Sequence, residues 1–136
     1  MNCVSHNKDL VLHEGGTFDL EYRWSVDGVI QSLDGCTGLM QIRKKLADAT
    51  PLLDLPFVSD AWAADGVSGI YIKDDGITPE LQGWYRIYVN DADSMGLCDS
   101  HKQIEGVYTL FLYSSLGEAI LKMYGVMTIE PSAARV

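Results

Sequence analysis

The chain has 136 residues, of which 47% are hydrophobic and 21% charged, a globular composition and a length that fits one domain over residues 1–136. Its formal net charge of −9 argues against a nucleic-acid partner, because binding to phosphates depends on Lys and Arg. No apolar run approaches the roughly 20 residues of a membrane-spanning helix, which argues against a membrane partner.

The cysteines indicate the compartment in which the chain folds. Cys3, Cys36 and Cys98 are odd in number and far apart, which favours free thiols and a reducing environment. The opening residues, MNCVSHNKDL, lack the apolar core of a signal peptide. We therefore expect synthesis and folding in a cytoplasm.

Residues 18–26 alternate between apolar and polar side chains. The apolar set is Phe18, Leu20, Tyr22, Trp24 and Val26, and the set between them is Asp19, Glu21, Arg23 and Ser25. This period of two predicts a strand with one buried face that includes Trp24. Asp27-Gly28 follows directly and predicts a tight hairpin, because glycine adopts positive φ without steric cost.

Further short segments predict more strands. After Asp34-Gly35, residues 39–46 place Met40, Ile42 and Leu46 on one expected inner face. Pro51 and Pro56 cannot donate to a ladder, so we expect residues 52–58 to form an edge strand or an irregular strand. Additional strands are expected at 10–12, 69–76 and 84–89, with Asp74-Asp75-Gly76 as a turn.

The last third of the chain predicts a second hairpin. Residues 106–130 alternate on both sides of Leu116-Gly117, and Gly125 marks a bulge or a close contact. The only helical segment expected lies near 92–98 and has one or two turns. Together these segments predict an all-β chain, an antiparallel β-sandwich of about seven to nine strands.

Patterns for metal binding are incomplete. Cys98 and His101 are two zinc ligands of the four that a closed site needs. The spacing of Asp91 and Asp93 suggests a calcium loop, but Met95 stands where an oxygen ligand belongs, so a turn or a helix N-cap is the better interpretation.

Patterns for catalysis are also missing. Ser68 in GVSG lacks the spacing of a nucleophile elbow. We find neither a phosphate-binding loop nor a dinucleotide fingerprint. We therefore expect no enzyme activity, no cofactor and no metal.

The remaining candidates for function are interface residues. Trp62 stands among alanines in an expected loop, where an aromatic side chain could anchor a partner. Arg43, Lys44 and Lys45 form the only basic cluster of the chain. Trp24, Tyr22 and Tyr108 lie on alternating segments, so we expect these three to pack between sheets.

The order of segments resembles a family of small phage and prophage virion proteins. The resemblance rests on GGTFDLEYRWSVDGVIQSLDGCTGLMQIRKK at 15–45, with its turn at 33–37 and strand end at 41–43, and on GVYTLFLYSSLGEAILKMYGVMTIEP at 106–131. The family is similar in outline to the N-terminal domain of the phage baseplate upper protein. The resemblance implies an immunoglobulin-like β-sandwich that serves as an attachment module.

This resemblance implies a non-enzymatic virion protein of tail, baseplate or head that docks to other virion proteins, and a homo-oligomer in a symmetric assembly. Two alternatives stay open. A glycan- or receptor-binding module would use Trp62, Asp91 and Asp93, with calcium as a possible aid. A host-directed inhibitor made early in infection would present its acidic surface to a basic protein.

Overall fold

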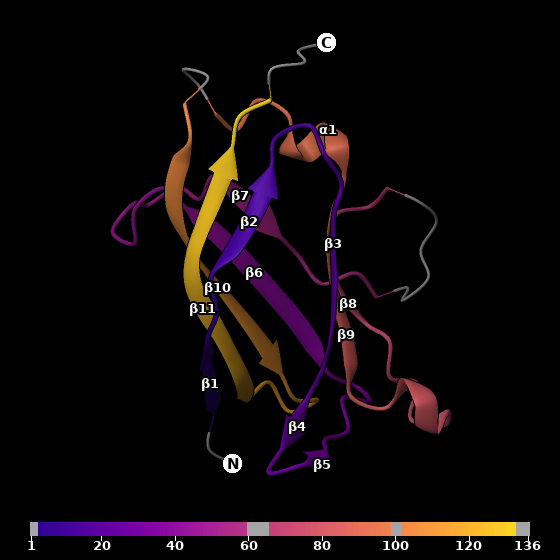
Figure 1. Ribbon diagram of the computed structural model, residues 1–136. Coiled ribbons are helices and arrows are strands. Elements are labelled where there is room, and N and C mark those ends of the chain that lie inside the picture. Colours follow the sequence, from indigo (N-terminus) through magenta and orange to yellow (C-terminus); the bar gives the residue numbers. More distant parts are fainter. Residues whose placement is uncertain (1–2, 60–65, 99–101, 133–136) are drawn as a thin grey trace.

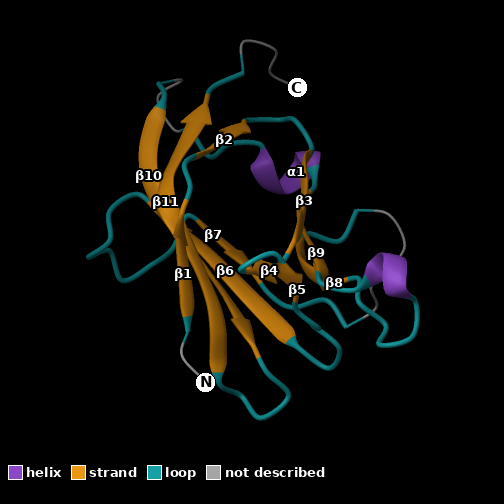
Figure 2. Cartoon of the chain, turned by 60° about the horizontal axis from the view of Figure 1, so that its bottom comes forward, coloured by secondary structure: helices purple, strands orange, loops and turns teal. Residues whose placement is uncertain are grey.

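The computed structural model describes residues 3–59, 66–98 and 102–132, and this part of the chain is all-β (Figures 1 and 2). The strands are β1 (Val4–Asn7), β2 (Leu10–His13), β3 (Phe18–Arg23), β4 (Ser25–Val26), β5 (Val29–Ile30), β6 (Thr37–Arg43), β7 (Leu53–Leu55), β8 (Gly69–Ile72), β9 (Trp84–Val89), β10 (Ile104–Tyr113) and β11 (Ala119–Glu130). The expected short helix is α1 (Asp91–Ser94), and a 3₁₀ turn, η1 (Pro79–Leu81), was not expected. Among these elements no helix has the length and apolar character needed to span a membrane.

Two sheets enclose the core. The six-stranded sheet has the order β1-β11-β10-β6-β7, with β2 also paired to β11, and the three-stranded sheet has the order β3-β9-β8. Figure 1 shows β3, β8 and β9 facing the larger sheet. One cluster of buried side chains fills the space between them, including Met40, Leu110 and Leu112 from one sheet and Ile70 and Ile87 from the other.

The alternation of apolar and polar residues over 18–26 correctly predicted β3. Phe18 is buried and Trp24, just past the strand, is only 6% exposed, so the predicted core position of Trp24 is confirmed. The Asp27-Gly28 hairpin also forms: both residues have positive φ, 51° and 80°, as a primed turn requires. The hairpin is short, however, because β3 pairs with β9 and only two residues on each side of the turn pair with each other.

The prediction for Leu46 was wrong. Met40 and Ile42 are fully buried as expected, but β6 ends at Arg43 and Leu46 is 77% exposed. Beyond the strand the Lys45 N–H donates to Asp48 Oδ2 in a turn. Alternation no longer determines which way a side chain points once the chain has left the sheet.

The proline-flanked segment lies at an edge, as expected. β7 pairs only with β6 at one end of the larger sheet. The chain then crosses to the smaller sheet, where the Pro56 carbonyl accepts the Ile70 N–H and the Val58 N–H donates to the Ile70 carbonyl. This crossing segment connects the two layers.

The larger sheet is not entirely antiparallel, contrary to the prediction. β1 and β2 both run parallel to β11, which at 12 residues is long enough to pair with the two in succession. β1 was not predicted at all, because its sequence, VSHN, has no apolar alternation and its pairing depends on backbone groups. Lys8, between the two strands, donates its N–H to the Tyr124 carbonyl.

Gly125 lies at this junction and is a close contact, whereas the bulge in the hairpin lies between Leu112 and Tyr113. A Cβ at Gly125 would lie 2.4 Å from the Lys8 carbonyl oxygen.

We expect Gly125→Ala to lower the free energy of unfolding by about 1–3 kcal/mol, since the backbone between β1 and β2 must move away from the new Cβ. Denaturant unfolding measures this, and Thr128→Ala on the same strand should stay within about 0.5 kcal/mol. Equal losses of stability in the two variants would contradict the close approach of Gly125 to the Lys8 carbonyl.

Candidate functional site: the outer face of the six-stranded sheet

The residues considered for metal binding do not converge. The part of the chain that the structure describes contains no group of three His, Cys, Asp or Glu side chains able to hold a metal ion. Cys98 is buried, while His101 lies outside the described residues. All three cysteines are free thiols.

The cap of α1 is the residue before the two aspartates, and Asp91 Oδ1 also accepts a backbone N–H at the helix start, from Ala92 at 2.9 Å. The cap is Asn90, whose Oδ1 accepts the Asp93 N–H at 2.6 Å, because Asn90 is the last residue with extended backbone before the helix. Asp93 instead accepts a hydrogen bond from the Ser68 hydroxyl. These polar groups therefore join a loop to the short helix.

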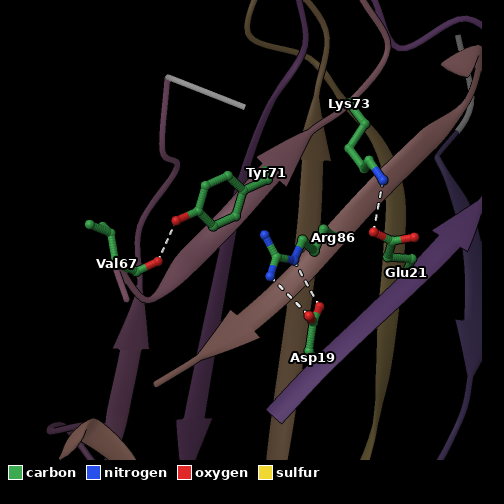
Figure 3. A network of polar contacts seen from close by, with 6 residues as sticks. All are labelled: Asp19, Glu21, Val67, Tyr71, Lys73 and Arg86. Carbon is green, nitrogen blue, oxygen red and sulfur yellow. Dashed lines mark hydrogen bonds and ion pairs between the residues drawn. The ribbon is translucent and has the colours of Figure 1, made fainter. Parts of the chain in front are cut away.

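The outward surface of the three-stranded sheet carries a paired charge network (Figure 3). Arg86 donates from Nε and Nη2 to the two carboxylate oxygens of Asp19, at 2.8 and 2.9 Å, and Lys73 Nζ lies 2.8 Å from Glu21 Oε1. The hydrogen bond to Asp19 raises the pKa of Arg86. Because its cations and carboxylates satisfy one another, this surface offers little to a ligand.

The outward surface of the six-stranded sheet is different: it is largely apolar and aromatic. We call it the docking face. It is formed by side chains that alternate with buried ones on β6, β10 and β11, namely Leu39, Gln41, Arg43, Val107, Thr109, Phe111, Tyr113, Lys122, Tyr124 and Val126, together with Leu46 beyond β6. Tyr124 and Val126 are 38% and 37% exposed. No described helix covers this face (Figure 2).

A groove runs across the docking face. It consists of two adjoining hollows of about 270 and 430 Å³. Both are bordered by Leu46, Val107, Thr109 and Lys122, so they are continuous. Leu46, which the prediction placed in the core, thus forms part of the wall of the groove.

The charges in the groove are mainly positive, although the chain is strongly acidic. Arg43 Nη2 donates to Gln41 Oε1 at 2.8 Å, and Nη1 is buried without a hydrogen-bond partner among the described residues. Lys122 Nζ lies 5.3 Å from the Tyr124 ring centroid. Neither cation forms an ion pair within the described chain. Asp9, at one end, accepts the Val126 N–H.

The structure brings one of the four predicted interface residues into this groove. Arg43 lies in it, while Lys44 and Lys45 are exposed in the turn after β6. Trp62 lies outside the described residues. The basic cluster is therefore divided by the end of a strand.

Most of the docking face was missed by sequence reasoning, including Phe111, Lys122 and Tyr124. A signal was present in GVYTLFLY, whose outward positions are as apolar as its inward ones, whereas the outward positions of β3 are Asp19, Glu21 and Arg23. A strand with two apolar faces is covered on both or presents one to a partner.

No protein-family model matches the chain, and no curated protein matches it. The similarity to phage virion proteins therefore stays a prediction from the sequence.

Proposed function

We propose that this protein is a non-enzymatic binding module that docks through the groove of its docking face. The observation that carries the proposal is an apolar and aromatic surface that no described helix covers, with two cations that have no acidic partner in the described chain. A complementary partner supplies an apolar side chain to the groove and a carboxylate to Arg43 and Lys122. Buried aromatic groups and arginines commonly dominate such contacts.

We further propose that the partner is another protein of a phage particle, in tail, baseplate or head, and that the chain is made in the host cytoplasm. The sequence resemblance supports this setting. The strand order supports an immunoglobulin-like sandwich: β11, β10, β6 and β7 correspond to strands G, F, C and C′, and β3, β9 and β8 to B, E and D. The first strands lie beside the last strand rather than beside β3.

A symmetric particle would hold several copies of the chain, so we propose that copies occupy equivalent positions around an axis. Docking through a rigid sheet suits this role, since the surface is already formed before the partner arrives. Little conformational entropy is then lost on binding.

Substitution on the docking face should remove the chain from particles without unfolding it. We expect Tyr124→Ser to reduce its incorporation roughly tenfold or more, because an aromatic anchor contributes about 2 kcal/mol or more to an interface. The measurement is quantitative mass spectrometry of purified particles made by the genome that encodes the chain. Lys122→Glu should act in the same direction.

Ile77→Ser is the matched control, because Ile77 is also a large exposed apolar residue, 86% exposed, but lies outside the groove. It should leave incorporation unchanged. Wild-type chain absent from particles would overturn the virion setting and favour an early host-directed role. Equal incorporation of the Tyr124→Ser and Ile77→Ser variants would overturn the proposal that the chain docks through this face.

A further inference from the structure

A second hollow opens between the edges of the two sheets. It measures about 290 Å³ and lies between β1 of the larger sheet and β3 of the smaller one. His6, Lys8, Tyr22, Trp24, Tyr85 and Met123 are among its lining residues. This volume equals that of about ten water molecules, so it accommodates one ring-sized organic molecule.

Two polar groups on largely buried side chains lie at this cleft without a hydrogen-bond partner in the described chain. The Trp24 indole Nε1 is buried and has no partner among the described residues. Tyr85 is only 4% exposed as a residue, and its hydroxyl bonds to no described residue. Buried polar side-chain groups such as the Trp24 indole N–H normally have partners. By contrast the Tyr108 hydroxyl, in the same core, donates to the Lys8 carbonyl.

The Tyr85 hydroxyl retains its proton. Desolvation raises the pKa of Tyr85, and the neighbouring Tyr22 and Tyr108 raise it further. Tyr22 pairs with Tyr85 across β3 and β9, with ring centroids 5.8 Å apart. The cleft therefore contains a hydrogen-bond donor on an aromatic wall.

The ionisable side chains at the rim are basic. His6, Lys8 and Arg23 line the cleft, and no Asp or Glu does, in a chain with a net charge of −9. Arg23 is held by the Gln82 and Pro79 carbonyls, whereas Lys8 Nζ rests 4.9 Å from the Tyr22 ring centroid and forms no ion pair within the described residues. This arrangement favours an anion.

We propose that the cleft binds a small carboxylate with a ring-sized body, with the carboxylate at Lys8 and His6 and the ring beside Tyr22 and Met123. The Tyr85 hydroxyl donates to the bound molecule. Both a sugar acid and an aromatic acid have this chemistry. The site does not involve the groove of the docking face and does not depend on the proposed function.

Titration of the whole protein with glucuronate and with benzoate, followed by amide NMR, tests the site. We expect saturable shifts at Lys8, Tyr22 and Tyr85 with at least one acid, and at least fivefold weaker binding of the uncharged counterpart, glucose or benzyl alcohol. Tighter binding of glucuronate would indicate that the cleft binds an acid with a hydroxylated ring, and tighter binding of benzoate would indicate an acid with an aromatic ring. Absence of saturable shifts in the cleft with either acid overturns the proposal, as does equal binding of the uncharged counterparts.

Tyr85→Phe separates a ligand role from a structural one. Because the hydroxyl bonds to no described residue, its removal should leave the unfolding midpoint unchanged while weakening binding about three- to tenfold, the usual contribution of one hydrogen bond.

Lys8→Met should weaken binding of the acid about tenfold, because it removes the charged partner of the carboxylate. Tyr88→Phe is the matched control on the opposite side of β9 and should bind as the wild type does. Equal affinity of the Tyr85→Phe and Tyr88→Phe variants overturns the proposal.

Discussion

Trp24→Ala should lower the free energy of unfolding by about 3–5 kcal/mol, the range for removing a large aromatic side chain from a core. Trp24 is 6% exposed and belongs to the main buried cluster. Its backbone also links two segments, since its N–H donates to the Gly83 carbonyl and its carbonyl accepts the Gln31 N–H. The alanine variant keeps those bonds, so the loss reports the side chain. Chemical denaturation at neutral pH measures it.

Trp24→Phe is the informative companion. The indole Nε1 has no hydrogen-bond partner among the described residues, so phenylalanine loses volume but no hydrogen bond to them. We expect this variant to lose clearly less stability than the alanine variant. A loss below about 1 kcal/mol for Trp24→Ala would contradict its place in the core.

Asp74→Ala should lower the free energy of unfolding by about 2–5 kcal/mol, because it leaves buried backbone donors without an acceptor. The buried carboxylate of Asp74 accepts the N–H groups of Leu33, Gly83 and Gly76, at 2.7, 3.0 and 2.9 Å. These donors come from separate loops, so one side chain joins them at the end of the sandwich. Asp54→Ala, at an exposed position of β7, should stay within about 0.5 kcal/mol.

The contribution of Asp74 should depend on pH. Burial alone would raise the pKa of this carboxyl, but the three donated N–H groups outweigh burial and lower the pKa below its ordinary value of 3.8. The folded state therefore favours the ionised carboxylate. The stability that this carboxylate contributes is fully present above pH 3.8 and is lost as the pH falls through the lower pKa of the folded state. The stability difference between wild type and Asp74→Asn should shrink on acidification below that value. A difference that grows there would contradict the assignment.

The all-β class, most strands and the hairpins could be predicted from the sequence. Strand alternation depends on neighbouring residues only, and the Asp27-Gly28 turn depends on the local preference for positive φ. The segments at β3, β8, β9, β10 and β11 were accordingly found in nearly the right places. The sequence showed Asp74 only as part of a turn. Two of its three donors, Leu33 and Gly83, are distant in the chain or in a separate loop, and only Gly76 belongs to the turn itself.

The sequence by itself determined that this chain forms strands with distinct faces, since side-chain direction alternates at every residue. Only the tertiary structure decided which of those faces is left without a covering element among the described residues. The docking face combines β6 with β10, which begins about 60 residues after β6 ends, and with β11, which follows β10. The cleft joins β1 to β3 across two sheets. Strand pairing is made by backbone groups common to all residues, so partners far apart in the chain carry no local signal.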